Sequence, residues 1–268
     1  MTTTMSDRIL LAGLLALTAS AAPAALPAQA AGADFHWSGK LNPGQRLEIK
    51  GVNGSIHATA ASGATADVTA RKHGRRSDPA SVQIKVVTTA EAVTICAVYP
   101  TPDDADQENT CESGRHWHSN TRDNDVVVDF TVQVPAGADF DGHTVNGDID
   151  ATALGGNTQL NTVNGSIDVS TAGHAEAETV NGSIRAAMGK ADFDDAEFRT
   201  VNGGITLTLP ADLNTEVRAE TVNGDLDSDW PVTITGRWGP RKMHGTIGKG
   251  GRTLTLGTVN GDIKLRKS

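Results

Sequence analysis

Two cysteines and the histidines that follow them are the residues of this chain with the most evident chemistry. Cys96 and Cys111 enclose a polar, acidic segment, and His116 and His118 come shortly after it. In an exported chain the thiols meet an oxidising compartment, so we expect a disulfide between Cys96 and Cys111. The alternative is a metal site formed by the two thiolates with His116 and His118, although this spacing matches no zinc pattern.

The segment after the second cysteine groups an aromatic side chain with basic and imidazole side chains. Arg115, His116, Trp117 and His118 are consecutive. A Trp beside Arg and His suits contact with a sugar or a protein partner, so these four residues form a candidate recognition loop. The alternative is that Trp117 covers the edge of a β core.

Aspartates recur two residues apart, and a β-strand places such a pair on one face. Asp148 and Asp150 form one pair, and Asp225 and Asp227 form another. Carboxylate oxygens are the ligands that Ca²⁺ prefers, so calcium binding is one interpretation. The equivalent positions elsewhere hold Ser, Gly, Arg, Thr or Lys, which favours an ordinary solvated face. We therefore expect no metal ion and no other cofactor.

The sequence contains no recognisable catalytic constellation. A nucleophile elbow, a zincin helix, a phosphate loop and a dinucleotide fingerprint are all missing from a usable context. We expect no enzymatic activity; the alternative is a carbohydrate-active β-helix enzyme that uses the paired aspartates as acid and base. The formal net charge of −9 gives no reason to expect nucleic acid as a partner.

One short motif recurs through the second half of the chain and organises it. It reads Thr-Val-Asn-Gly, then Asp, Ser or Gly, then Ile or Leu, with an earlier copy at Gly51. From Val145 onward its valines are 18, 17, 21, 21 and 37 residues apart, and the last step is close to two repeats. Near-constant spacing of one unit is typical of a solenoid. The expected repeat turns are Asn53-Gly54, Asn146-Gly147, Asn164-Gly165, Asn181-Gly182, Asn202-Gly203, Asn223-Gly224 and Asn260-Gly261.

Each motif position has an expected structural role. Val and Ile favour strands and should stack in the core, while Asn-Gly tolerates the positive φ angles of a tight turn. Stacked copies would align the asparagines in a ladder. The Ile or Leu after each turn alternates with polar residues, so one face should be core and the other solvent. Asn-Gly is also a hairpin signal, which makes a β-meander or barrel the competing fold.

Three segments are expected along the chain. Residues 1–30 resemble a signal peptide, because Arg8 precedes an apolar run and Ala28-Gln29-Ala30 suits a signal peptidase. An uncleaved anchor is the alternative. After cleavage no stretch is long and apolar enough to cross a membrane. Residues 31–141 should form a less regular N-terminal β region with the disulfide loop, and residues 142–268 the β-solenoid repeat region.

The repeated motif, the string from Val93 to Pro100, and Arg122-Asp123-Asn124-Asp125 before a long strand together resemble a bacterial exported β-strand-repeat family. Its function is unknown, and its members are described as adhesins. The resemblance implies an all-β, parallel β-helix-like solenoid and supplies no catalytic residues.

The sequence and this resemblance together lead us to expect a non-catalytic, adhesin-like binding or scaffolding protein. It would be periplasmic, secreted or at the cell surface, with an envelope protein or a glycan as partner. A purely structural spacer is a further alternative.

Overall fold

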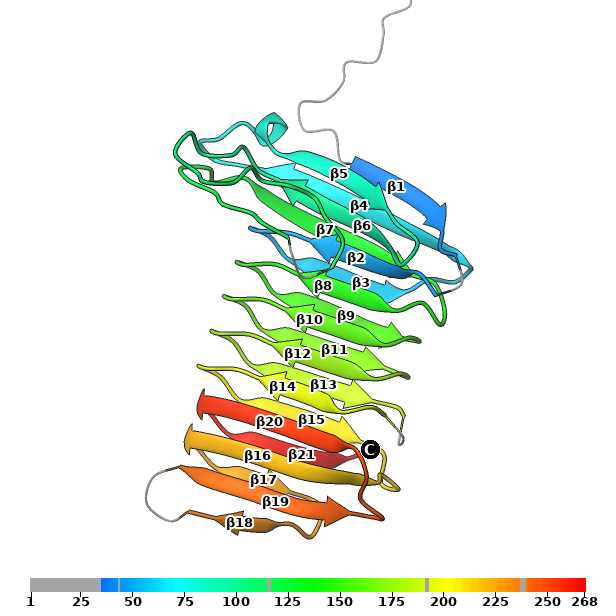
Figure 1. Cartoon of the computed structure of the whole chain (residues 1–268), viewed down its shortest axis with the longest axis vertical. Helices are drawn as coiled ribbons and strands as arrows, with labels where there is room; N and C mark the ends of the chain where they lie inside the picture. The colour runs from blue at the N-terminus through cyan, green and yellow to red at the C-terminus, as the bar shows by residue number, and fades with distance from the viewer. Residues whose placement is uncertain (1–34, 43, 115–116, 191–192, 237–239) are drawn as a thin grey trace, which may run out of the picture. The chain divides into compact units, whose positions relative to one another are not determined.

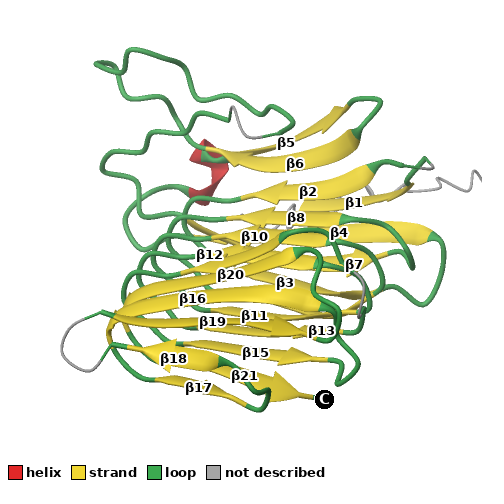
Figure 2. Cartoon of the chain, turned by 60° about the horizontal axis from the view of Figure 1, so that its bottom comes forward, coloured by secondary structure: helices red, strands yellow, loops and turns green. Residues whose placement is uncertain are grey.

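Each motif copy connects a strand of one sheet to a strand of a second, opposing sheet. The computed structural model describes residues 35–42, 44–114, 117–190, 193–236 and 240–268, all within one compact unit, Ala31–Ser268. Figure 1 shows the two-strand units, which we call rungs, stacked one on the next. Figure 2 shows strands throughout these residues and one short helical turn, η1 (Pro79–Ser81).

The described strands form two sheets. The ten-stranded sheet runs in spatial order through β1 (Phe35–Lys40), β4 (Thr65–His73), β7 (Val127–Val134), β3 (Ile56–Ala60), β9 (Ile149–Leu154), β11 (Ile167–Thr171), β13 (Ile184–Met188), β15 (Ile205–Leu209), β21 (Ile263–Lys267) and β17 (Leu226–Ser228). The eleven-stranded sheet runs through β18 (Thr233–Thr235), β19 (Arg241–Ile247), β16 (Thr215–Asn223), β20 (Thr253–Asn260), β14 (Ala196–Arg199), β12 (Ala175–Glu178), β10 (Thr158–Asn161), β8 (Phe140–His143), β2 (Arg46–Lys50), β6 (Ala92–Val98) and β5 (Gln83–Thr88).

Neighbouring rungs pair in parallel and in register, which confirms the solenoid. On β9, β11 and β13 the motif isoleucines lie directly over one another, as Ile149↔Ile167 and Ile167↔Ile184. All three are fully buried, as the alternation predicts. A meander is excluded for these rungs, because its sequential strands would be antiparallel.

Five of the seven motif valines are not in the core, so the expectation that the valines stack there is wrong for these rungs, whereas Val52 is buried and Val145 packs half-buried against the core. Val163, Val180 and Val201 are 38–39% exposed, whereas the preceding threonines are buried. Thr162 Oγ1 donates to the Gly147 carbonyl oxygen of the adjacent rung at 3.0 Å. The corner residue that points inward is therefore the threonine, because its hydroxyl has a backbone acceptor there.

The motif glycines are required for a reason other than a positive φ. Among them, Gly54 has a φ of 126° and the others are not in the left-handed region. A Cβ built on Gly165 would lie 2.0 Å from the Gly147 carbonyl oxygen. Stacked corners approach so closely that no side chain fits between them.

The last motif interval does not contain two rungs. The strands β20 and β21 insert between the β14–β15 rung and the β16–β17 rung, so Asn260 lies between Asn202 and Asn223. The residues between the two copies form β18 and β19, an antiparallel pair that extends the eleven-stranded sheet beyond β16.

The first motif copy belongs to the same stack despite its distance in sequence. The strands β2 and β3 pair in parallel with β8 and β9, and Asn53 bridges Asn146. Next to them, β6 pairs in parallel with β2, and β7 pairs in parallel with β3. This β6–β7 rung has residues 99–126 where the other rungs have the short corner.

The expected signal peptide, residues 1–30, lies outside the described residues. No helix within the part of the chain that the structure describes has the length and hydrophobicity that a membrane crossing requires.

Candidate ligand-binding groove

The outer face of the eleven-stranded sheet carries two columns of polar side chains. Successive residues of a strand alternate between faces, and parallel in-register pairing places equivalent residues side by side. The first column consists of Cys96, Lys50, His143, Asn161, Glu178 and Arg199. The second consists of Thr94, Glu48, Asp141, Gln159 and Glu176, with Glu197 next on β14.

Residues 99–126 are called the disulfide loop, and their described part, 99–114 and 117–126, folds over one end of these columns. The Cys96–Cys111 disulfide is present, with its Cα atoms 5.6 Å apart. Lys50 Nζ donates to the carbonyl oxygens of Glu112 and Gly114 at 2.6 and 2.5 Å. The loop is thus tied to both β6 and β2.

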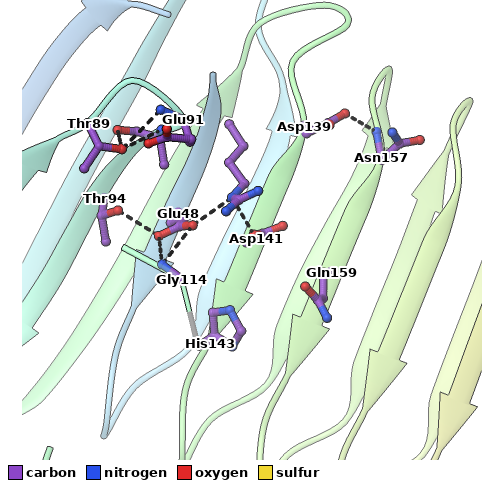
Figure 3. A network of polar contacts seen from close by, with 12 residues as sticks. Glu48, Thr89, Glu91, Thr94, Gly114, Asp139, Asp141, His143, Asn157 and Gln159 are labelled. Atoms are coloured by element: carbon purple, nitrogen blue, oxygen red, sulfur yellow. Dashed lines mark hydrogen bonds and ion pairs between the residues drawn. The ribbon is translucent and has the colours of Figure 1, made fainter. Parts of the chain in front are cut away.

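The loop buries a cluster of charges beneath it. The side chains of Glu48 and Lys50 are each 1% exposed, and Lys50 Nζ lies 3.6 Å from the Glu48 carboxylate. Glu48 accepts hydrogen bonds from Thr94 Oγ1 at 2.7 Å and from the Gly114 N–H at 3.0 Å. Figure 3 shows these two contacts and places Asp141 on the neighbouring strand.

Burial and hydrogen bonding pull the pKa values in this cluster in opposite directions. Burial alone would raise the pKa of Glu48, but hydrogen bonds from Arg46, Thr94 and Gly114 lower it to about 2. Burial raises the pKa of Asp141 to about 6, against the attraction of Arg46. Burial also lowers the pKa of Lys50, although Glu48 opposes that shift. Glu48 therefore remains ionised at neutral pH.

Beyond the edge of the disulfide loop the two columns are open and form the floor of a groove. The cavity measures about 270 Å³. Gly114 and Trp117 of the loop line it on one side. Its other lining residues are Lys50, His143, Gln159, Asn161, Glu176, Ala177, Glu178, Glu197 and Arg199.

Most polar side chains of the floor contact one another, either across rungs or within one strand. The His143 ring lies 3.3 Å from Asn161 Nδ2, and Gln159 Nε2 donates to Glu176 at 3.4 Å. Arg199 forms an ion pair with Glu197. Within the described residues, the Glu178 carboxylate has no such partner.

The candidate recognition loop is only partly described. Trp117 is half-buried, packs against the hydrophobic core and lines the groove. Its Nε1 is buried and has no acceptor among the described residues. His118 lies in the loop beyond the groove lining, and its carbonyl accepts from the Thr110 N–H at 3.4 Å. Arg115 and His116 lie outside the described residues.

The proposed metal sites are not assembled. The thiolate alternative is wrong, because the sulfurs of Cys96 and Cys111 are bonded to each other. In the described residues no three His, Cys, Asp or Glu side chains gather closely enough to hold a metal ion. The four aspartates considered for calcium contact neighbouring segments instead: Asp148 accepts from the Ser166 N–H, Asp150 pairs with His57, Asp225 with Arg241 and Asp227 with Arg266.

The repeat turns form a continuous side-chain ladder at one corner of the stack. In each step an asparagine Nδ2 donates to the Oδ1 of the asparagine in the preceding rung of the stack, at 2.7–2.8 Å. The ladder runs through Asn53, Asn146, Asn164, Asn181, Asn202, Asn260 and Asn223. Since these amides bond to one another, their role in the structure is to hold the rungs together.

Sequence reasoning missed the floor of the groove. Its residues lie on the short strands that precede the motif, where a pattern such as Gln159-Leu160-Asn161 reveals the outward positions. The same alternation of outward polar and inward apolar residues is present in the other rungs. It therefore does not show which outward side chains lie beside the disulfide loop.

Comparisons with known proteins bear on the family. A family model described as Toastrack DUF4097 matches residues 44–266. Similar solved structures include a candidate cell adhesion protein from Clostridium sporogenes, with 9% identity over 88% of this chain and 100% of that chain and a TM-score of 0.43. Another is a candidate adhesin from Bacteroides fragilis, with 13% identity over 88% of this chain and 97% of that chain and a TM-score of 0.37. These TM-scores are too low to carry an argument about function. No curated protein matches the sequence.

Proposed function

The chain belongs to the Toastrack DUF4097 family, and on this premise we propose that it is a non-catalytic, exported binding protein of the bacterial envelope. The family resemblance drawn from the motif is thereby confirmed. The proposed ligand site is the groove beside the disulfide loop, and the proposed ligand is an envelope protein or a glycan.

One observation carries this proposal: at the β6–β7 corner the disulfide loop replaces the short motif, and residues of this loop line the groove. Elsewhere the corner from the eleven-stranded sheet to the ten-stranded sheet is the short motif. At this corner residues 99–126 instead fold across β6 and β2, and Trp117 lines the cavity. Binding residues concentrate on loops that a rigid scaffold positions.

Two further observations support binding rather than catalysis. The aspartates on which the enzyme alternative depends bond to neighbouring segments. The groove, by contrast, offers a half-buried indole and the Glu178 carboxylate, which has no partner among the described residues, and both suit recognition. Sites for small ligands combine apolar walls with a few placed polar groups in this way.

The compartment is part of the proposal. A disulfide persists in oxidising surroundings, which supports export to the periplasm or the cell surface. Removal of residues 1–30 by a signal peptidase remains a prediction, checked by the N-terminal sequence of the secreted protein.

A pull-down from envelope extract tests the proposed site. The bait is tagged residues 31–268, and the variant is Trp117→Ala combined with Asn161→Ala, which changes the groove without touching the disulfide. Glu220→Ala is the matched control, because Glu220 lies in the first column beyond the groove and pairs with Lys242. All three baits must first give the same circular dichroism spectrum.

We expect a partner that wild type and Glu220→Ala both retain and the groove variant loses. A partner retained equally by all three baits would place binding elsewhere on the solenoid. Recovery of no partner by any bait would favour the spacer alternative over binding.

A further inference from the structure

Among the residues that the structure describes, the groove floor has more carboxylates than cations. Glu176, Glu178 and Glu197 line it, and Arg199 is already paired with Glu197. Lys50 adds no accessible charge, because its ammonium is buried against Glu48 and the disulfide loop. An anionic polymer would therefore meet repulsion in this groove, and the surplus carboxylate favours a cationic group.

Glu178 is the point at which a cation would bind. Its side chain is exposed and lies between Asn161 and Arg199 in the first column. No other side chain of the described residues pairs with its carboxylate. A hydrogen bond to an ionised acceptor is stronger than one between neutral groups, so an ammonium group of a ligand suits this position.

The spacing of the floor suits a ligand that repeats. Adjacent strands of a sheet lie about 4.7–4.9 Å apart, so each column presents one side chain per rung at that interval. An extended chain of sugar rings that crosses the strands would meet a new floor residue with about every ring. The amide and carboxylate groups of Asn161, Gln159 and Glu176 are suited to accept and donate hydrogen bonds with ring hydroxyls.

The size of the groove and its aromatic side favour a sugar over a protein surface. Its volume of about 270 Å³ lies just below the range of small-ligand sites, about 300–1,000 Å³. That is room for one or two rings of a longer chain. Trp117 lies at the edge of this space and offers a flat apolar body against which a sugar ring can pack.

We propose that the groove binds an oligosaccharide of amino sugars, with a protonated amine paired with Glu178 and a ring packed beside Trp117. This assignment rests on the proposed function, which makes the groove the ligand site. It excludes uronic acid polymers and other anionic glycans as ligands.

Isothermal titration calorimetry of disulfide-bonded residues 31–268 tests the assignment. The probes are a β-1,4-linked glucosamine tetramer, the N-acetylglucosamine tetramer, a galacturonic acid tetramer and a lysine tetrapeptide, at a mildly acidic pH that protonates the amine. We expect the glucosamine tetramer to bind about tenfold more tightly than its acetylated form, which is the effect of one charge-assisted contact. The galacturonic acid tetramer should not bind.

Three variants locate the contact. Glu178→Gln should abolish the preference for the free amine, because it removes the charge and keeps the shape. Trp117→Ala should weaken binding of both amino-sugar tetramers. Glu220→Gln removes a carboxylate from the same column beyond the groove, and it should leave every affinity unchanged.

Several results would overturn the ligand class. One is equal affinity for the two amino-sugar tetramers, and another is no effect of Glu178→Gln on the preference for the free amine. The others are tighter binding of the galacturonic acid tetramer or of the lysine tetrapeptide than of the glucosamine tetramer. If no oligosaccharide binds while the groove variant still loses its envelope partner, the proposed function stands and this ligand assignment fails. If the groove variant also keeps its partner, both fail.

Discussion

The chain passes from the eleven-stranded sheet to the ten-stranded sheet in two different ways. In the regular rungs, such as β10–β11, the five residues Thr162–Ser166 suffice. In the β6–β7 rung the same passage takes residues 99–126 and includes a cysteine of the disulfide. Each kind of rung has one strand in each sheet. The strands β6 and β7 pair in parallel with β2 and β3 of the adjacent motif rung, as β11 pairs in parallel with β13.

The difference shows what stacking permits. A regular corner is held on both sides, because each motif glycine lies against the corner before it and is covered by the one after it. The β6–β7 corner has a motif corner on one side only, since its outer neighbours β5 and β4 pair antiparallel. Space is therefore available there for a long segment. Repeat proteins tolerate insertions at positions of this kind.

The largest expected effect separates the two faces of a regular rung. Ile167→Asp should abolish cooperative folding at 25 °C, because Ile167 is fully buried. The substitution loses about 1.5–3 kcal/mol of hydrophobic stabilisation. Burial of an unpaired carboxylate costs several kcal/mol more, and the two costs together are comparable to the whole stability of a domain. Val163→Asp, at a 39% exposed corner, should cost less than about 1 kcal/mol. Thermal melts followed by circular dichroism compare them. A wild-type melting temperature for Ile167→Asp would refute its inward placement.

The close approach of the corners predicts the next effect. Gly165→Ala should lower the free energy of unfolding by about 3 kcal/mol or more, because its Cβ would lie 2.0 Å from the Gly147 carbonyl oxygen. Gly63→Ala is the control, since nothing lies within 4 Å of a Cβ there. Urea unfolding measures both. Equal midpoints for the two variants would show that stacked corners can separate at little cost.

Removal of the disulfide tests whether the stability of the whole stack of rungs depends on the β6–β7 rung and its loop. Cys96→Ala with Cys111→Ala should cost about 2–3 kcal/mol by the chain-entropy account. Amide hydrogen exchange should rise in residues 99–126 and in β6, while β9 to β15 keep their protection. Equal loss of protection in all rungs would mean that the disulfide loop supports the whole solenoid.

Acidity should act on Asp141, on β8 of the motif rung next to the disulfide loop. Burial raises the pKa of Asp141 from 3.8 to about 6, so the folded state holds this proton more tightly than the unfolded state. Stability from this group is therefore present below pH 4 and is lost as the pH rises towards 6. Relative to wild type, the stability of Asp141→Asn should rise by about 2–3 kcal/mol between pH 4 and pH 7. Melts across that range measure the difference, and a constant difference would contradict the shift.

The smallest expected effect concerns the asparagine ladder. Asn181→Ala removes two side-chain hydrogen bonds, to Asn164 and from Asn202. It should cost about 1 kcal/mol, because the site is exposed and each such bond has a modest net value. Asn223→Ala, at the end of the ladder, removes a single one and should cost about half as much. Urea unfolding compares them, and no cost at either position would leave the ladder without a stabilising role.

The groove is less accessible to sequence reasoning than the repeat. The Cys96–Cys111 pairing and the attention to Trp117 came from residue types and spacing alone. The floor residues His143, Asn161 and Glu178 have no special type, and their neighbourhood depends on strand register and on the path of the loop. Pairing of residues far apart in sequence leaves no local pattern.

The sequence by itself determined the repeat, the buried isoleucines such as Ile167 and the asparagine ladder. These follow from period-two alternation and from equal spacing of identical residues, both of which are local or periodic properties. The tertiary structure alone decided that five of the seven motif valines face solvent, that β20–β21 insert between earlier rungs, and that the disulfide loop lies over β2. Each of these depends on which backbone groups meet across rungs, and those contacts are set by stacking rather than by the order of residues along the chain.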